Sequence, residues 1–425
     1  MRSAKSLTTA GTLAVAALIL SGCSSAPAEP TDVALRMTVW TSNEEQLALF
    51  DSIADEYMQD HPEVTSVTFD PLNFEDYTTT LTTQIAGGKA PDLAWVLENA
   101  APDFVTSGAL AEIEPMLEST EGYELDDLND AATELWRNDG KLIAYPFSTS
   151  PFVVFANDDL LKEAGLPSSA ELQADGKWNW EDISELGSEV NAQTGKSGFV
   201  IRDFDYTTWD NLASVWMGWG AEPWSADGKT CEFDSPEMAD AFTFLHDAAF
   251  DKKSMPGPGT TADFFAGDAA FTVTQISRAS LLADGGFGWN LLPLPEGPVG
   301  EYSMVGQAGI GVMKQGKNQQ VATDFLAFFT SPENSEKLAQ YFPPARNSQL
   351  NAETLSAANP VLTEEQITDV VVPGISTGVD RPSHTDSAQI GQAVRAALDA
   401  VWTENADIPA VLADVCTAID PLLSK

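Results

Sequence analysis

The chain is poor in the residues that most often carry chemistry or bind nucleic acid. It has three histidines, three cysteines and 21 basic residues against 64 acidic ones, for a formal net charge of −43. Such a balance argues against nucleic-acid binding and against adsorption to anionic lipid. His61, His246 and His384 lie far apart, and Cys231 and Cys416 lack the spacing of zinc ligands. We therefore expect neither a metal nor another cofactor.

Motifs of catalysis are missing as well. The sequence contains no G-x-S-x-G, no Walker loop and no G-x-G-x-x-G after a strand. With so many acidic residues, a pair of carboxylates is expected by chance and does not indicate a glycosidase. A non-catalytic binding protein is favoured. If the protein is exported, a disulfide between Cys231 and Cys416 is permitted, but the sequence does not decide whether it forms.

The N-terminus holds the one long apolar run, Leu7 to Leu20, after a short basic region. The run is too short to span a bilayer comfortably, which is typical of a secretory signal. It ends in Leu-Ser-Gly-Cys23, which resembles the lipobox of bacterial lipoproteins. That resemblance implies that 1–22 are a signal peptide and that Cys23 carries lipid. Residues 23–34 then form a tether on the outer face of the cell membrane.

The first part of the chain alternates between strand and helix patterns. Strands are predicted over 35–40, 64–69 and 91–96, and two amphipathic helices lie between them. This order indicates a parallel sheet with ligands beyond the carboxyl ends of its strands.

Polar residues follow two of these strands and are candidate ligand contacts. Trp40, Asn43 and Glu44 follow the first strand, and Glu98 and Asn99 follow the third. Both groups open helices, so capping of those helices is an equal alternative for Glu98 and Asn99.

The stretch 141–166 has two apolar runs separated by Ser148 to Pro151. One interpretation is a hairpin within one sheet. The other is a chain that crosses from one lobe to another. Because alternating α/β patterns flank the stretch on both sides, the crossing is favoured, and Ser150 is placed near the floor of a cleft.

An aromatic region follows. Trp209 and Trp216 are seven residues apart, so one helical face can carry both. Aromatic rings stack on the C–H faces of sugars while carboxylates and amides bind the hydroxyls. We expect Tyr206 and Trp209 to be exposed to a cleft and Trp216 to lie in the core.

Several segments resemble, in order and spacing, the extracellular sugar-binding proteins of bacterial ABC importers, which include the maltose-binding type. They are TVW at 38–40, GGKAPDLAWV at 87–96, SGALAEIEPML at 107–117, KLIAYPF at 141–147, NDDLLKEAGLP at 157–167, FFAGDAAFTV at 264–273, LLPLPEG at 291–297 and FPPARNS at 342–348. The resemblance implies an α/β, two-lobed, periplasmic-binding-protein-like (Venus flytrap) fold with about three hinge crossings. It places 35–147 with 308–348 in the first lobe and 151–304 with 351–425 in the second.

The resemblance also bears on the site. The family often has an aromatic contact in the loop that here reads Gln275-Ile276-Ser277-Arg278, and this chain has none. Ser277 and Arg278 are candidate contacts, although Arg278 is equally able to cap a turn or pair with a surface acid. Arg346, in the third crossing region, either faces the cleft or ties the hinge.

The hypothesis is a lipid-anchored, monomeric receptor that captures a saccharide, more specifically an oligosaccharide, for a permease with a separate ATPase. The alternatives are a receptor for another solute, such as a peptide or polyamine, and a surface glycan hydrolase or adhesin.

Overall fold

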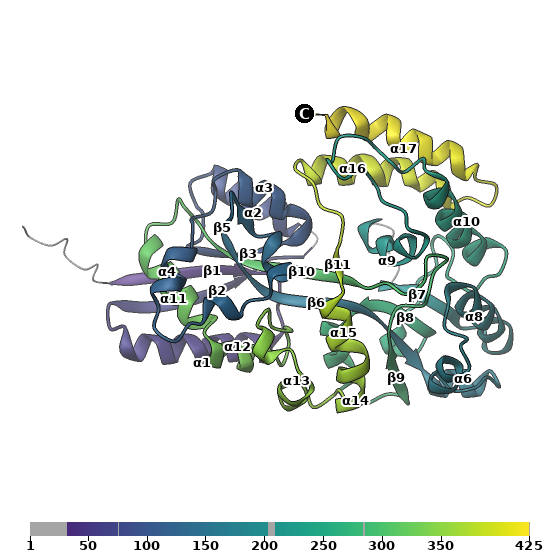
Figure 1. Ribbon diagram of the computed structural model, residues 1–425, viewed down its shortest axis with the longest axis horizontal. Coiled ribbons are helices and arrows are strands. Elements are labelled where there is room, and N and C mark those ends of the chain that lie inside the picture. Colours follow the sequence, from purple (N-terminus) through teal and green to yellow (C-terminus); the bar gives the residue numbers. More distant parts are fainter. Residues whose placement is uncertain (1–31, 75, 203–208, 284, 425) are drawn as a thin grey trace, which may run out of the picture.

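The computed structural model describes residues 32–74, 76–202, 209–283 and 285–424, and the statements below concern these residues. The chain forms two lobes joined by long central strands (Figure 1). Each lobe has a hydrophobic core of its own. One core draws on residues 33–147 and 308–345, and the other mainly on 152–304 and 355–423. Both lobes are therefore assembled from segments that are far apart in the sequence.

The first lobe begins with the alternating pattern that the sequence predicts. Its first elements are β1 (Val33–Val39), α1 (Glu44–Asp60), β2 (Val64–Pro71), α2 (Tyr77–Ala86) and β3 (Leu93–Leu97). Strand β1 pairs in parallel with both β2 and β3. Helix α1 begins where Asn43 accepts hydrogen bonds from two backbone N–H groups, and it buries Phe50, Ile53 and Tyr57. The predicted parallel sheet is confirmed.

Short elements and two returning helices complete this lobe. They are η1 (Glu98–Ala100), α3 (Ala101–Thr106), α4 (Glu114–Ser119), η2 (Leu125–Asp127), α5 (Asp130–Glu134), β4 (Arg137–Asn138), β5 (Lys141–Leu142), α11 (Gln319–Phe329) and α12 (Pro332–Leu338). Helix α11 packs on the sheet through Phe325 and Phe329. The C-terminal half of the sequence thus supplies part of the first core.

Two long strands connect the lobes. Strand β6 (Ala144–Asn157) is continuous over 14 residues and buried throughout. It pairs antiparallel with β10 (Met304–Val312), so that Thr149 faces Gln307. The sheet order is β2-β1-β3-β10-β6-β8-β7, where β8 spans Ala269–Gln275 and β7 spans Ser197–Ile201. Strand β11 (Val379–Asp380) pairs with β10, and β9 (Trp289–Leu292) pairs with β6. The hairpin interpretation is therefore wrong, because the polar residues between the apolar runs belong to one uninterrupted strand.

The segment predicted as the third crossing is irregular rather than a strand. Pro343 and Ala345 accept backbone hydrogen bonds from Thr149 and Asn129, at 3.0 and 2.8 Å. The short strand that adds to β10 in this region is β11, about thirty-five residues further along the chain.

The second lobe surrounds the far ends of the shared strands. Its elements are α6 (Asp158–Glu163), α7 (Ser169–Ala174), α8 (Trp180–Thr194), β7 (Ser197–Ile201), η4 (Trp209–Leu212), α9 (Ala213–Trp216), η5 (Met217–Trp219), α10 (Pro236–Phe250), η6 (Phe264–Ala266), β8 (Ala269–Gln275), η7 (Ile276–Leu282), β9 (Trp289–Leu292), η8 (Asn347–Gln349), α13 (Ala352–Ala358), α14 (Glu364–Gln366), the π-helical turn η9 (Ile367–Val371), α15 (Val372–Ser376), α16 (Ser387–Leu398), η10 (Asp399–Trp402) and α17 (Ile408–Leu423). Strand β7 runs parallel to β8, and both β8 and β9 run antiparallel to β6.

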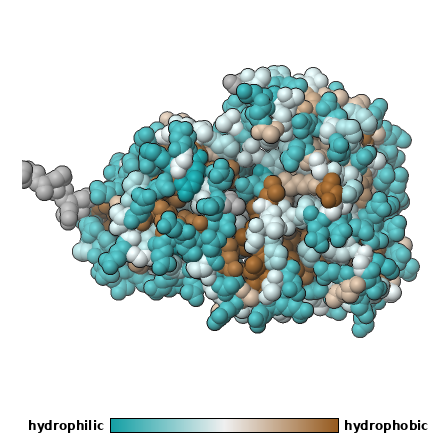
Figure 2. Space-filling view, in the orientation of Figure 1, coloured by the Kyte–Doolittle hydropathy of each residue, from teal (hydrophilic) through white to brown (hydrophobic). Residues whose placement is uncertain are grey.

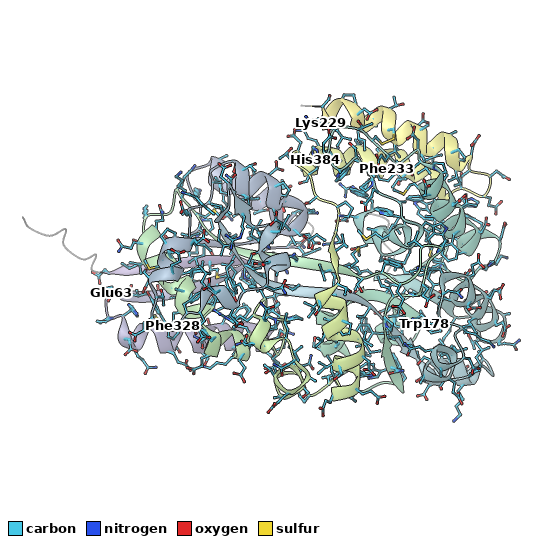
Figure 3. All side chains as sticks on the ribbon, in the orientation of Figure 1. Glu63, Trp178, Lys229, Phe233, Phe328 and His384 are labelled. Carbon is cyan, nitrogen blue, oxygen red and sulfur yellow. A yellow bond between two sulfur atoms is a disulfide. The ribbon has the colours of Figure 1, made fainter. Side chains whose placement is uncertain are left out.

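A disulfide ties the end of the chain to the second lobe. Cys231 and Cys416 are bonded, with Cα atoms 5.2 Å apart, which answers the question that the sequence left open. Phe233, two residues after Cys231, is fully buried beside Trp216. Figure 3 labels Phe233 in the second lobe, near α17. The bond thereby fastens α17 to the loop that precedes α10.

Candidate functional site

A buried arginine joins the two lobes at their junction. Arg381, directly after β11, is 7% exposed and forms ion pairs with Glu98 of the first lobe and Asp210 of the second. Its Nη1 also donates a hydrogen bond of 2.7 Å to Asn211 Oδ1. Burial lowers the pKa of Arg381 to about 10, so the side chain is still protonated at neutral pH. Residues of η1 and η4 thus meet around one guanidinium, whose residue directly follows β11.

Gln307 connects this cluster to the crossing strands. Its backbone N–H donates to Glu98, which is fully buried at the carboxyl end of β3. Its side-chain oxygen accepts from Trp136 Nε1 at 2.9 Å, and its Nε2 donates to Asp380 Oδ1 at 2.5 Å. The amide therefore has a defined orientation, and a crossing strand is coupled to charged groups of both lobes.

Asp380 and Arg381 are consecutive, and successive side chains of an extended segment leave on opposite faces. Arg381 reaches Glu98 and η4, whereas Asp380 lines a cavity of about 260 Å³ beside the crossing strands. Burial raises the pKa of Asp380 to about 6. The two residues thus serve different faces of the junction.

An aromatic group lies at the first lobe's side of the junction. Trp40 is half-buried and makes edge contacts with Trp95, Tyr77 and Phe74, with ring centroids 4.6, 5.2 and 6.2 Å apart. Arg202, directly after β7, lies over the ring of Phe74 with its Cζ 5.4 Å from the centroid. Trp40 therefore belongs to an aromatic cluster that touches the second lobe through Phe74.

Three of the polar residues predicted after β1 and β3 make no contact with the cluster around Arg381 in the described part of the chain, namely Asn43, Glu44 and Asn99. Asn43 caps α1, and Glu44 is exposed in its first turn. Asn99 is half-buried within η1. Of the residues after β3, Glu98 is the one that reaches the inter-lobe cluster.

The two predicted serines lie together. The backbone N–H of Ser277 donates to Ser150 Oγ at 3.2 Å, and Ser150 is 4% exposed on β6, opposite Gly306. Their contact joins the start of η7 to the crossing strand.

The expected exposure of Trp209 is wrong. Its side chain belongs to the second core, where it stacks on Trp216 with centroids 5.9 Å apart and packs against Trp224 and Phe233. A Cβ added at Gly391 of α16 would lie 3.3 Å from its Nε1, so α16 helps to cover the indole. Trp216 is fully buried, as predicted. Tyr206 and Cys23 lie outside the described residues.

The two arginines predicted as ligand contacts, Arg346 and Arg278, both contact other groups of the protein. Arg346 is fully buried and donates to the backbone oxygens of Glu124 and Thr330, at 3.2 and 3.1 Å. Its guanidinium also lies over the ring of Tyr123. Of the two alternatives, the structural tie describes its contacts. Arg278 lies over the ring of Phe265, with its Cζ 4.7 Å from the centroid.

Sequence reasoning missed Asp210, Gln307, Asp380 and Arg381. Gln307 offered a signal, since it is a polar residue within a run of glycine and apolar residues. The others have no such mark, because segments distant in sequence bring them together. Within the described ranges, no group of three or more His, Cys, Asp or Glu side chains is placed to hold a metal ion, and no helix is long and apolar enough to cross a membrane.

Comparison with known proteins gives consistent matches. The family model of a bacterial extracellular solute-binding protein matches residues 52–363. An uncharacterized lipoprotein in the oleD 5′ region of Streptomyces antibioticus is 24% identical over 342 residues, covering 77% of this chain and 73% of its own. The sn-glycerol-3-phosphate-binding periplasmic protein UgpB of Escherichia coli is 24% identical over 327 residues, covering 71% and 72%. Maltose-bound MalE3 of T. maritima superimposes with a TM-score of 0.78 at 18% identity, covering 92% of this chain and 99% of its own.

Proposed function

The chain belongs to the bacterial extracellular solute-binding proteins, and from that premise we propose that it captures a saccharide at the junction of its lobes. The observation that carries the proposal is the cluster around Arg381, in which Glu98, Asp210 and Asn211 surround one guanidinium. Carboxylates and amides accept hydrogen bonds from hydroxyl groups, and a guanidinium donates to them. Such a set suits a neutral ligand that is rich in hydroxyls.

The charges of the cluster favour a saccharide over a phosphate ester. The guanidinium of Arg381 is already paired with Glu98 and Asp210, so a phosphate group would meet two carboxylates and have to displace them. Leaving a buried carboxylate without its partner is costly. A sugar hydroxyl can exchange single hydrogen bonds with the same groups without changing their charge. This separates the proposal from the glycerol-3-phosphate ligand named for UgpB.

We expect the affinity for the ligand to depend on the relative position of the two lobes. Glu98 lies between the first-core residues Val96 and Ala100, and Asp210 lies between the second-core residues Trp209 and Leu212. Arg381 follows β11, which pairs with the crossing strand β10. A ligand that contacts both groups binds best when the lobes are together, and it shifts the population toward that arrangement. A permease with a separate ATPase then takes up the ligand from the closed form. Lipid on Cys23 holds the monomeric receptor on the outer face of the membrane, and the relative that is named a lipoprotein supports this anchoring.

The test is calorimetry on the mature protein with neutral mono- to tetrasaccharides, sn-glycerol 3-phosphate, a polyamine and a short peptide. We expect a neutral saccharide to bind and to raise the melting temperature by mass action, with an oligosaccharide above a monosaccharide. We expect Glu98→Gln to weaken that binding by about tenfold or more, because one charged hydrogen-bonding group is lost. Binding of glycerol 3-phosphate with no saccharide bound refutes the proposal.

Two controls complete the design. Glu118→Gln removes an exposed carboxylate on α4 and should leave the affinity unchanged. Chromatography of the oligosaccharide after long incubation detects hydrolysis, and its appearance would indicate a glycan hydrolase instead of a receptor.

A further inference from the structure

Helix α16 of the second lobe begins against a carboxylate of the first lobe. The backbone N–H of Asp386, the residue before α16, donates a hydrogen bond of 2.9 Å to Asp103 Oδ1. Asp103 lies on α3, next to Phe104 of the first core, whereas Ile390 of α16 belongs to the second core. In Figure 1, the N-terminal end of α16 is the end nearer to α3. The hydrogen bond therefore crosses the junction of the lobes.

Asp386 does not cap α16 with its own side chain. Helices α8 and α10 begin at Asn179 and Ser235, whose side chains accept from backbone N–H groups of the first turn. Asp386 has a left-handed φ of 60°, and its side chain makes no such hydrogen bond in the described part of the chain. A carboxylate near the N-terminus of a helix is favourable, because the helix dipole places partial positive charge there. Asp103 brings such a carboxylate to α16 from the other lobe.

A second contact joins the same two stretches of chain. Glu98 of η1 pairs with Arg381, directly after β11. Five residues further along each stretch, Asp103 of α3 accepts from Asp386, directly before α16. The segment 381–386, which we call the connecting segment, therefore contacts the first lobe at both of its ends.

The middle of the connecting segment contacts the second lobe. His384 Nε2 lies 2.9 Å from the backbone oxygen of Gly228, and its ring meets that of Trp224 edge-on, with centroids 5.4 Å apart. Trp224 packs against the second core, and the connecting segment leads directly into α16 of the same core. The segment is thus anchored on the second lobe, so the hydrogen bond to Asp103 is made only when the first lobe is close.

We propose that Asp103 is a positioning residue that holds the two lobes together by accepting the hydrogen bond from Asp386. A hydrogen bond to an ionised carboxylate is stronger than one between neutral groups, and both residues are half-buried at this contact. When the lobes separate, water replaces the protein partner of each group, and the preference for the closed arrangement is lost. Asp103 thus raises the closed fraction of the ligand-free protein.

A larger closed fraction also raises the affinity for a ligand that binds the closed arrangement, since less of the population has to be shifted. This consequence for affinity rests on the function proposed above, whereas the effect on the lobes does not. Asp103 acts through Asp386, and its role requires no contact with the ligand.

The test compares Asp103→Ala with Asp386→Gly in the mature protein. Each variant removes one carboxylate from the same contact, but Asp386→Gly keeps the backbone N–H, and glycine adopts a left-handed φ readily. Small-angle X-ray scattering without ligand reports the separation of the lobes as a radius of gyration, and hydrogen exchange reports the protection of the Asp386 N–H. We expect Asp103→Ala to increase both quantities and Asp386→Gly to increase neither. Asp103→Asn, which keeps an acceptor oxygen, should increase both by less.

Affinity and stability complete the comparison. Calorimetry with the saccharide that binds the wild type best should show an affinity lowered by about threefold to tenfold in Asp103→Ala and unchanged in Asp386→Gly. The urea midpoint of Asp103→Ala should stay close to that of the wild type, because each lobe has a core of its own.

The proposal is overturned if Asp103→Ala leaves the radius of gyration of the ligand-free protein unchanged. It is equally overturned if Asp386→Gly increases that radius as much, since loss of charge would then be the cause. A lower urea midpoint of Asp103→Ala without any change in radius would show that Asp103 serves folding alone. If no saccharide binds, the function proposed above fails, and the scattering comparison still decides the role of Asp103.

Discussion

Replacing Asp380 by asparagine should stabilise the protein at neutral pH and leave it unchanged in acid. Burial raises the pKa of Asp380 from its ordinary value of 3.8 to about 6 in the folded protein. The folded state therefore holds the proton more tightly than the unfolded state. The proton bound to Asp380 stabilises the folded state to its full extent below about pH 4. This contribution to the free energy of unfolding is lost as the pH rises through about 6. The loss corresponds to about 3 kcal/mol, and asparagine avoids it because its amide cannot ionise.

The measurement is urea unfolding followed by tryptophan fluorescence at several pH values between about 4 and 8. The side-chain oxygen of the new asparagine can still accept from Gln307, so the local hydrogen bond is kept. We expect the variant to exceed the wild type by about 3 kcal/mol above about pH 7 and to match it near pH 4. Asp175→Asn, at an exposed position, should show no such dependence. A difference between Asp380→Asn and wild type that stays flat over this range would refute the reasoning.

Three further outcomes follow from packing and connectivity. Replacing both Cys231 and Cys416 by serine should lower the free energy of unfolding by about 2–5 kcal/mol, and a reducing agent should lower the wild-type melting temperature in parallel. Arg346→Met should cost about 2–4 kcal/mol, because two hydrogen bonds to buried carbonyls are lost, but should leave ligand affinity unchanged in calorimetry. Reduced affinity in a folded Arg346→Met protein would return that residue to the site. Gly309→Ala should cost about 1–3 kcal/mol in urea unfolding, since the new Cβ would lie 2.6 Å from the Trp136 ring, and an unchanged midpoint would contradict this packing.

The surface at the junction of the two lobes is partly hydrophobic. Figure 2 shows hydrophobic residues gathered in the hollow between the lobes, with hydrophilic ones over most of the remaining face. Val379 of β11 is 57% exposed, and it lines the cavity beside the crossing strands. Such a patch is expected where two bodies approach each other without forming one continuous core.

The elements of both lobes could be predicted because their signals are local. The spacing of Phe50, Ile53 and Tyr57 marks α1, and the apolar runs around Ser150 mark β6. Each depends on periodicity and caps within a few residues. The indoles of Trp209 and Trp216 do stack, but they belong to two short elements, η4 and α9, and not to one regular α-helix.

Whether a given side chain is buried or exposed could not be predicted from the local sequence. The sequence predicts Trp209 in a cleft, but α16, nearly two hundred residues later, covers it. Arg346 carries a charge that favours the surface, but the carbonyls of Glu124 and Thr330 hold it in the interior. Burial of this kind depends on partners that no local window contains.

By itself, then, the sequence determined the alternation of strands and helices, the crossing at β6 and the resemblance to a family, because each depends on neighbouring residues or on ordered motifs. Tertiary structure alone decided the composition of the junction. Glu98, Asp210, Gln307 and Arg381 come from four separate segments, and only the return of β10 and β11 to the centre of the sheet brings them together. The disulfide between Cys231 and Cys416 was decided in the same way, since a bond needs two Cα atoms within a few ångströms, and folding supplies that distance.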